Sequence, residues 1–304
     1  MTCWNYRYAG LNVVSELPLS EWAIFEQVEP FADAHVRITL QSTRSGSISQ
    51  PADVWITPDE YCFSIPETGD YRVARGREII ITPAPEAGQA ELRLFLLGTA
   101  WSALCYQRGI LALHASVIWV NEQAIAFCGP SGAGKSSLAA GFVARGYPLI
   151  GDDLCCFDFA AGGAQVYPSA PRLKLWREAL TNLGWQDEHL TRDHFRLDKF
   201  HKELTGSETR DPVPVRAICL LEWGELALTR LTGLKALRRL VAAATYRPGL
   251  LEPLGRVGAY WEQCAQLARA VPIFELRRSR DWVMMTAAID LLLQNWELPP
   301  PMIK

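Results

Sequence analysis

The sequence predicts an α/β protein with a β-rich N-terminal region, and three observations carry that prediction. Short alternating or apolar runs, bounded by Pro, Gly or charged residues, occupy the first 90 residues. A strand, a glycine-rich turn, a helix and another strand follow one another between residues 114 and 158. The composition, with 49% hydrophobic and 21% charged residues, is typical of a globular protein and excludes a disordered or fibrous one.

The chain of 304 residues is long enough for two domains of about 150 residues each. We predict a β-rich domain at residues 1–90, interpreted as a recognition domain because it carries no chemical signature. Residues 91–304 form the second predicted domain and contain the motifs described below. In the first domain, strands are expected at 36–40, 53–57, 61–65 and 78–82.

The second domain begins with an expected helix from Ala90 to Arg108, which Gly109 ends. The other expected strands are 114–120, 124–128, 148–158, 215–223 and 272–276. The other expected helices are 137–144, 234–244, 261–270 and 280–296. The polar stretch 185–214, mixed in charge, is expected to be a mobile excursion or a pair of short helices.

Charge and apolar patterning exclude several classes of partner. The formal net charge is -3, so no global positive field favours nucleic acid. The uncharged run from Leu94 to Tyr106 is shorter than the roughly 20 residues of a membrane span. The N-terminus lacks a secretory signal pattern. The 8 cysteines form no CxxC pair, which predicts free thiols in a reducing cytoplasm and no zinc site.

The strongest motif is Gly-Pro-Ser-Gly-Ala-Gly-Lys-Ser at residues 129–136, which fits GxxxxGK[ST] completely. An apolar strand precedes it and a helix follows it, which disfavours a chance glycine turn. Such a P-loop binds nucleotide phosphates through backbone N–H groups at a helix N-terminus. The predicted binding residues are Gly129, Ser131, Gly132, Ala133, Gly134, Lys135, Ser136 and Ser137. Lys135 would reach the β- and γ-phosphates and Ser136 would bind Mg²⁺, so ATP and Mg²⁺ are the expected cofactors.

A second motif, Asp152-Asp153, follows the apolar run 148–150. One carboxylate at the end of a neighbouring strand can hold Mg²⁺, and another can accept a proton from an attacking hydroxyl. The alternative, a surface turn, fits poorly with the apolar residues on both sides of the pair.

Three segments in this order carry a resemblance to a known family: Leu113-His-Ala-Ser, residues 129–137 and residues 145–153. They resemble the catalytic domain of the HPr kinase/phosphorylase family, a P-loop kinase core of the phosphoenolpyruvate-carboxykinase-like fold. The resemblance covers residues 109 to about 157 well. Residues 8–19 are similar to the N-terminus of HPr-kinase-like proteins from peptide-modification gene clusters, including kinases of lasso-peptide precursors.

The resemblance implies roles for individual residues. Asp152 matches the family aspartate that takes the proton, Asp153 would support Mg²⁺ or the phosphate, and His114 would lie near the transferred phosphate. Lys135 belongs to the same catalytic set. Adjacent strand residues point in opposite directions, so the sequence alone leaves open which aspartate faces the phosphate. Family relatives are often oligomers, which implies a homo-oligomer.

The chain also departs from the family. It has no Glu-Val-Arg-Gly-type run after the aspartates, so neither phosphorylase activity nor HPr as the substrate is expected. Arg172 and Lys174 alternate on an expected strand, and Lys199 lies in the polar stretch. These three are candidate contacts to phosphate or an acidic substrate, and a solvated basic face is the alternative. The arginines at 277, 278 and 280 are expected at the surface, with a docking patch for an acidic peptide as the alternative.

Together these patterns predict an ATP- and Mg²⁺-dependent serine/threonine kinase. Its acceptor would be the hydroxyl of a peptide or small protein, for which a ribosomal precursor peptide of the lasso type is a candidate. Two alternatives remain: a kinase of a small metabolite, and a nucleotide-gated binding module that transfers nothing. The aspartate pair disfavours the module, because binding alone needs no base.

Overall fold

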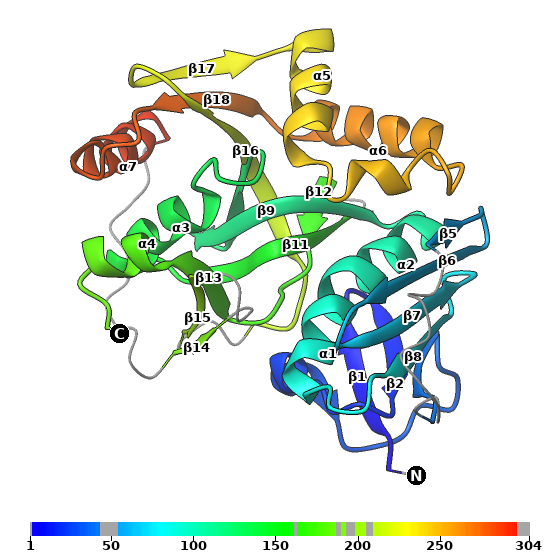
Figure 1. The fold of residues 1–304 in the computed structure, drawn as a ribbon. Helices are drawn as coiled ribbons and strands as arrows, with labels where there is room; N and C mark the ends of the chain where they lie inside the picture. The colour runs from blue at the N-terminus through cyan, green and yellow to red at the C-terminus, as the bar shows by residue number, and fades with distance from the viewer. Residues whose placement is uncertain are drawn as a thin grey trace. The chain divides into compact units, whose positions relative to one another are not determined.

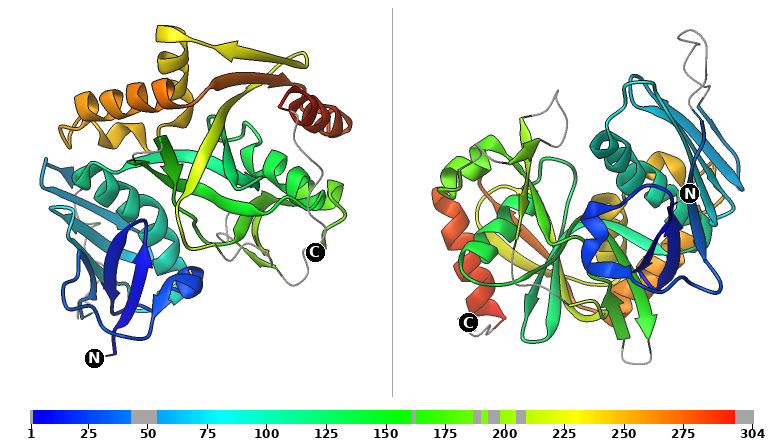
Figure 2. Two further views of the ribbon diagram at one scale, coloured as in Figure 1. Left: turned by 180° about the vertical axis from the view of Figure 1, so that it is seen from behind. Right: turned by 90° about the horizontal axis from the view of Figure 1, so that it is seen from below.

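The computed structural model describes residues 2–42, 54–160, 163–186, 190–192, 198–204 and 209–296. Over these residues the chain is a mixed α/β protein with several β-sheets, as the sequence predicted (Figures 1 and 2). It divides into two compact units. The first contains Met1–Ala112 and Arg247–Tyr260, and the second contains Leu113–Tyr246 and Trp261–Lys304.

The described residues of the first unit form an eight-stranded sheet in the order β3-β1-β2-β4-β8-β7-β6-β5. Its strands are β1 (Trp4–Tyr8), β2 (Leu11–Ser15), β3 (Glu26–Gln27), β4 (Val36–Leu40), β5 (Trp55–Ile56), β6 (Glu60–Ile65), β7 (Gly69–Ala74) and β8 (Glu78–Pro83). The predictions at 36–40, 61–65 and 78–82 are confirmed. Of the predicted strand 53–57, only Trp55 and Ile56 are paired, and residue 53 lies outside the described residues.

The first unit also contains the predicted helix after residue 90. It consists of α1 (Gln89–Phe95), a π-helical turn (Leu96–Ala100) and α2 (Trp101–Arg108), and it ends at Gly109 in the left-handed conformation. A 3₁₀ turn (Ser20–Phe25) and a second one (Pro248–Leu250) complete the unit.

The first unit extends to residue 112 rather than to the predicted boundary at 90, because this helix is bonded to the sheet. The Tyr71 hydroxyl on β7 donates to the carbonyl of Leu92 at 3.1 Å. The Gln107 amide donates to the carbonyl of Val73, also on β7, at 3.2 Å. These contacts are long-range, so composition along the chain did not indicate them.

The second unit contains a sheet in the order β10-β9-β11-β12-β16-β18-β17, in which β10 also pairs with β16. Its strands are β9 (Leu111–Val120), β10 (Gln123–Cys128), β11 (Leu149–Ala160), β12 (Gly163–Val166), β16 (Val213–Trp223), β17 (Ala227–Leu231) and β18 (Ile273–Arg278). A smaller sheet has the order β13-β15-β14, with β13 (Arg172–Trp176), β14 (Thr191–Arg192) and β15 (Lys199–Glu203). The helices are α3 (Lys135–Ala144), α4 (Arg177–Asn182), α5 (Gly233–Ala244), α6 (Val257–Ala270) and α7 (Val283–Asn295).

Strand direction in this sheet determines where a site can form. β16 runs parallel to both β10 and β18, so Cys128, Trp223 and Arg278 end their strands at the same edge. Carboxyl ends of parallel strands are the usual ligand edge of an α/β sheet. Helix α3 covers the sheet beyond this edge, with the Phe142 ring stacked on Phe127 at 5.4 Å.

The polar stretch 185–214 was predicted as a mobile excursion or short helices, and the described part corrects this. Residues 199–203 form β15, which pairs with β13 along its whole length. Phe200 alternates with charged neighbours and is buried in the core of the unit, and this one apolar side chain secures the strand. Because most residues of this stretch are polar or charged, the sequence shows no clear alternation of apolar and polar residues there. Residues 187–189, 193–197 and 205–208 lie outside the described residues.

None of the helices in the described ranges combines the length and the apolar character that crossing a bilayer requires.

Candidate active site

The glycine-rich turn connects β10 to α3, as predicted. Gly132 and Gly134 both have φ of 82°, in the left-handed region that favours glycine. A Cβ atom on Gly134 would lie 2.1 Å from a guanidinium nitrogen of Arg278, so this position also needs glycine for space. The turn leads into the first N–H groups of α3, which have no partner within the helix. Backbone donors at such a turn suit an anion.

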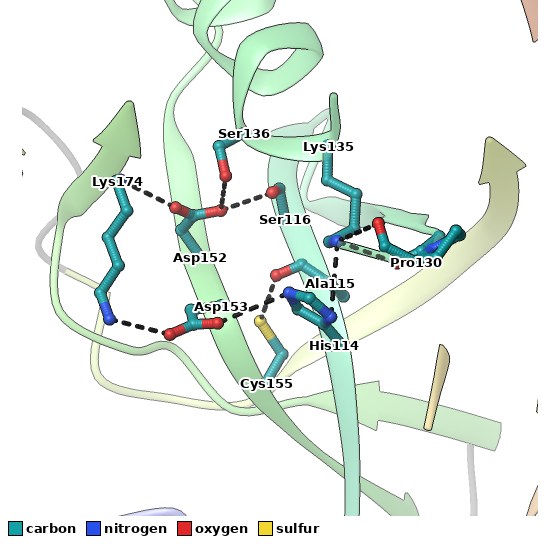
Figure 3. A network of polar contacts seen from close by, with 11 residues as sticks. His114, Ala115, Ser116, Pro130, Lys135, Ser136, Asp152, Asp153, Cys155 and Lys174 are labelled. Atoms are coloured by element: carbon teal, nitrogen blue, oxygen red, sulfur yellow. Dashed lines mark hydrogen bonds and ion pairs between the residues drawn. The ribbon is translucent and has the colours of Figure 1, made fainter. Parts of the chain in front are cut away.

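Lys135 is the first residue of α3, and its side chain is buried. Its ammonium donates to the carbonyls of Gly129 at 2.8 Å and Pro130 at 3.1 Å, and lies 3.5 Å from His114 Nδ1 (Figure 3). Burial lowers the pKa of Lys135, and the neighbouring Asp152 carboxylate opposes that effect. The cation therefore lies among the loop carbonyls, at the end of the loop where phosphates would bind.

Asp152, on β11, is directed toward the start of α3. Its Oδ1 accepts hydrogen bonds from the hydroxyls of Ser136, at 2.9 Å, and Ser116 (Figure 3). Its Oδ2 accepts the backbone N–H of Lys174 at 2.9 Å. Ser116 belongs to the Leu113-His-Ala-Ser segment, but sequence reasoning assigned it no role, because its contact with Asp152 depends on β9 and β11 being neighbours.

Asp153 has different partners. Lys174 Nζ donates to its Oδ2 at 2.9 Å, and His114 Nε2 lies 3.6 Å from its Oδ1. Burial alone would raise the pKa of this carboxyl, but Lys174, with contributions from His114 and Lys199, outweighs burial and brings the pKa well below its ordinary value. Asp153 is therefore ionised at neutral pH.

The two aspartates line the same cavity although they are adjacent on one strand. Adjacent strand residues normally point to opposite faces. Asp153 has φ of 79°, a conformation uncommon for a residue with a side chain, and this breaks the alternation. The strain of this backbone is what allows a pair of carboxylates to face one pocket.

His114, on β9, lies between the two charged groups of the site. Its ring is edge-on to Tyr246, with the centroids 5.4 Å apart. Burial, followed by the Lys135 ammonium, lowers the pKa of His114 to about 4, and Asp153 opposes this only in part. The imidazole is therefore neutral at pH 7, with Nδ1 toward the lysine and Nε2 toward the carboxylate.

We expect His114 to remain neutral across the physiological range. Its NMR ring resonances should not shift between pH 8 and about 5.5, whereas an ordinary histidine titrates near 6.5. The unfolded chain binds this proton near pH 6.5 and the folded chain only near 4, so this residue makes the free energy of unfolding decrease as pH falls between those values. A His114→Gln variant identifies the resonance and removes its share of the pH dependence. A resonance of His114 that titrates near 6.5 would contradict the geometry.

The cavity at this edge has a volume of about 390 Å³. The sequence-predicted residues that line it are His114, Ser131, Gly132, Gly134, Lys135, Ser136, Ser137, Asp152, Asp153, Lys174 and Lys199. Three others do not line it. The carbonyl of Gly129 accepts a hydrogen bond from the Lys135 ammonium, and the carbonyl of Ala133 accepts one from the Arg278 guanidinium. Arg172 lies two residues before Lys174 on β13.

Several lining residues were missed or misplaced by sequence reasoning: Trp176, Glu178, Trp223, Arg278, Arg280, Trp282 and Met285. Arg278 was expected at the surface with its neighbours, but it is only 3% exposed. Its run of basic residues suggested a solvated patch. The parallel pairing of β18 with β16 instead turns Arg278 toward the loop, whereas Arg277 stays exposed.

In the part of the chain that the structure describes, no three His, Cys, Asp or Glu side chains cluster as a dedicated metal cage. A Mg²⁺ ion that also binds substrate phosphates needs only one or two protein carboxylates. The oxygens of Ser136 and Asp152, 2.9 Å apart, fit that requirement. All eight cysteines are free, six of them buried.

No protein-family model matches the chain, and no curated protein matches it in sequence. Among solved structures, the fold is similar to that of the Hpr(Ser) kinase/phosphatase from Coxiella burnetii, with 10% identity and a TM-score of 0.31. The similarity covers 61% of this chain and 95% of that one. A similarity this weak supports no conclusion about activity, so the proposal below depends on the residues of the site.

Proposed function

We propose that this protein is an ATP- and Mg²⁺-dependent kinase that transfers the γ-phosphate to a hydroxyl group of a peptide or small protein. The observation that carries the proposal is that the two aspartates beside the phosphate loop have different partners. Asp152 contacts Ser136 of the loop, while Asp153, in the same cavity, is held by Lys174 and faces His114. A phosphate loop with two carboxylates in different settings suits phosphoryl transfer to a hydroxyl.

Ser136 and Asp152 would hold Mg²⁺. When bound, Mg²⁺ neutralises charge that develops on the β- and γ-phosphate oxygens. Asp152 already accepts three hydrogen bonds, including the Ser136 hydroxyl, so its orientation is fixed before any ligand arrives. The contacts therefore favour Asp152 as the metal aspartate, the reverse of the roles implied by the family resemblance.

Asp153 would orient the acceptor hydroxyl and take its proton. Its low pKa makes it a weak base, which suits a loose transition state in which the proton leaves late. Lys174 fixes the carboxylate, and Lys135 can leave the loop carbonyls to contact the phosphates. Transfer would then rest on positioning and on stabilisation of the phosphoryl charge by Lys135 and the loop N–H groups.

The acceptor side of the proposal rests on charge. Lys174 and Lys199 line the cavity near Asp153, so an acidic segment around the acceptor hydroxyl would be favoured. A serine or threonine in an acidic segment of a precursor peptide, of the lasso type for example, would meet this requirement. The β-rich first unit is the proposed recognition domain for such a peptide.

The proposal is tested by incubating the protein with γ-labelled ATP, Mg²⁺ and a panel of acidic serine and threonine peptides. We expect a mass gain of one phosphate on a peptide hydroxyl, lost when EDTA removes the metal. Small hydroxylated metabolites form a parallel panel. Transfer only to a metabolite would refute the peptide acceptor, and ATP hydrolysis without transfer to any acceptor would refute the kinase.

A further inference from the structure

Arg278 is a buried arginine that donates hydrogen bonds to the backbone of the phosphate loop. It ends β18, and its Nη2 donates to the carbonyls of Ala133 at 3.2 Å and Gly134 at 3.3 Å. These are the two residues that precede Lys135. The guanidinium also lies over the Trp223 ring, 4.6 Å from the centroid. The side chain therefore spans from the end of β16 to the turn of the loop.

The charge of Arg278 is not balanced by a carboxylate among the described residues. Two other arginines are paired: Arg277 lies 3.6 Å from Glu275, and Arg239 lies 2.7 Å from the same glutamate. Arg278 donates only to carbonyls, and its Nε, although buried, has no hydrogen-bond partner. Burial lowers its pKa to about 10, so it remains a cation at neutral pH.

A buried cation without an anion is costly, and proteins retain one where a ligand completes the pair. The cavity that Arg278 lines contains the phosphate loop, so the missing anion has a place beside it. A guanidinium is suited to this because it keeps its charge when buried and donates in several directions.

We propose that Arg278 is a positioning residue for nucleotide binding: it holds the loop at Ala133 and Gly134, and the polyphosphate of the nucleotide balances its charge. This rests on the proposed function, because it needs a nucleotide in the loop. It gives the protein a second cation for phosphate besides Lys135, supplied by β18 at the same edge of the sheet. It also explains why Gly134 must be glycine beyond the requirement of its φ angle.

The test compares Arg278→Met with wild-type protein by calorimetric titration with Mg·ADP and by thermal melting with and without the nucleotide. Methionine keeps much of the volume and the packing on Trp223. We expect about ten- to a hundredfold weaker binding, the usual value of a hydrogen bond to a charged group. Without nucleotide the melting temperature should change little, because the loss of the hydrogen bonds to Ala133 and Gly134 is opposed by the removal of a buried unbalanced charge. Arg277→Met, a neighbour with a side chain 54% exposed, is the matched control and should bind as wild type.

Equal affinity of Arg278→Met and wild type for Mg·ADP would overturn the inference. A lower melting temperature of Arg278→Met, with the same rise in melting temperature on adding Mg·ADP as in wild type, would also overturn it. If Arg278→Met does not fold, Arg278→Lys replaces it in the test. Lysine keeps the positive charge but lacks the paired donors of the guanidinium, so the affinity for Mg·ADP should be reduced. Wild-type affinity of Arg278→Lys for Mg·ADP would overturn the inference. Wild-type protein that binds no nucleotide would instead refute the proposed function itself.

Discussion

Replacing Lys135 with methionine is expected to reduce phosphoryl transfer by a factor of about 10² to 10³ and to weaken ATP binding. A preorganised donor aimed at developing charge contributes about that much to catalysis. The buried ammonium lies within 3.1 Å of two loop carbonyls, so only a short movement of the side chain would bring it to phosphates in the loop. Methionine nearly preserves the side-chain volume and removes the charge together with the hydrogen-bond donors of the ammonium. The measurement is the initial rate of transfer at saturating acceptor, together with direct titration of ATP.

Lys235→Met, an exposed lysine on α5, is the matched control and should retain full transfer. Thermal melting shows whether Lys135→Met is folded. Because the removed ammonium is buried with its pKa lowered, the folded state should tolerate the loss. A folded Lys135→Met protein with wild-type transfer would refute phosphate binding by this loop.

The glycine-rich turn between β10 and α3 was predictable from sequence because its conformation is determined locally. Gly132 and Gly134 adopt positive φ, and glycine is the residue that reaches this region without steric cost. The apolar patterns on either side of the turn predict strand β10 and helix α3. The same holds for most strands of the second unit, whose apolar runs are long enough to stand out.

The remaining parts of the site depend on contacts between distant segments. Lys174 reaches Asp153 from β13, and Ser116 reaches Asp152 from β9. Arg278 lies 144 residues beyond Gly134, which it contacts, and in sequence it resembles any basic surface run. Such residues become visible only when strand order is known. No alternation rule would place both aspartates in one cavity, because that outcome requires the unusual backbone of Asp153.

Substitution of the two aspartates should have different effects, with the larger loss in the rate of phosphoryl transfer at Asp153. Asp153→Asn keeps the shape but removes the proposed base, so transfer should fall by about 10² to 10⁴ while Mg·ATP affinity changes little. Asp152→Asn removes the charge that accepts the Ser136 hydroxyl. Its defect should therefore be weaker Mg·ATP binding and a higher Mg²⁺ requirement. This is the reverse of the allocation implied by the family resemblance, and it follows from the separate partners of the two carboxylates.

Mg²⁺ titrations at saturating acceptor, run beside direct measurements of ATP binding, distinguish the two roles. Asp158→Asn is the matched control, since it is the same substitution at an exposed position of the same strand and should leave both quantities unchanged. A metal defect in Asp153→Asn with only a rate defect in Asp152→Asn would restore the family allocation. Full activity in both would mean that the pair is structural, since a kinase cannot lose its base and its metal carboxylate without a cost in rate. The strained φ of Asp153 argues against that outcome, because a purely structural pair would have no reason to direct both carboxylates into the cavity of the phosphate loop.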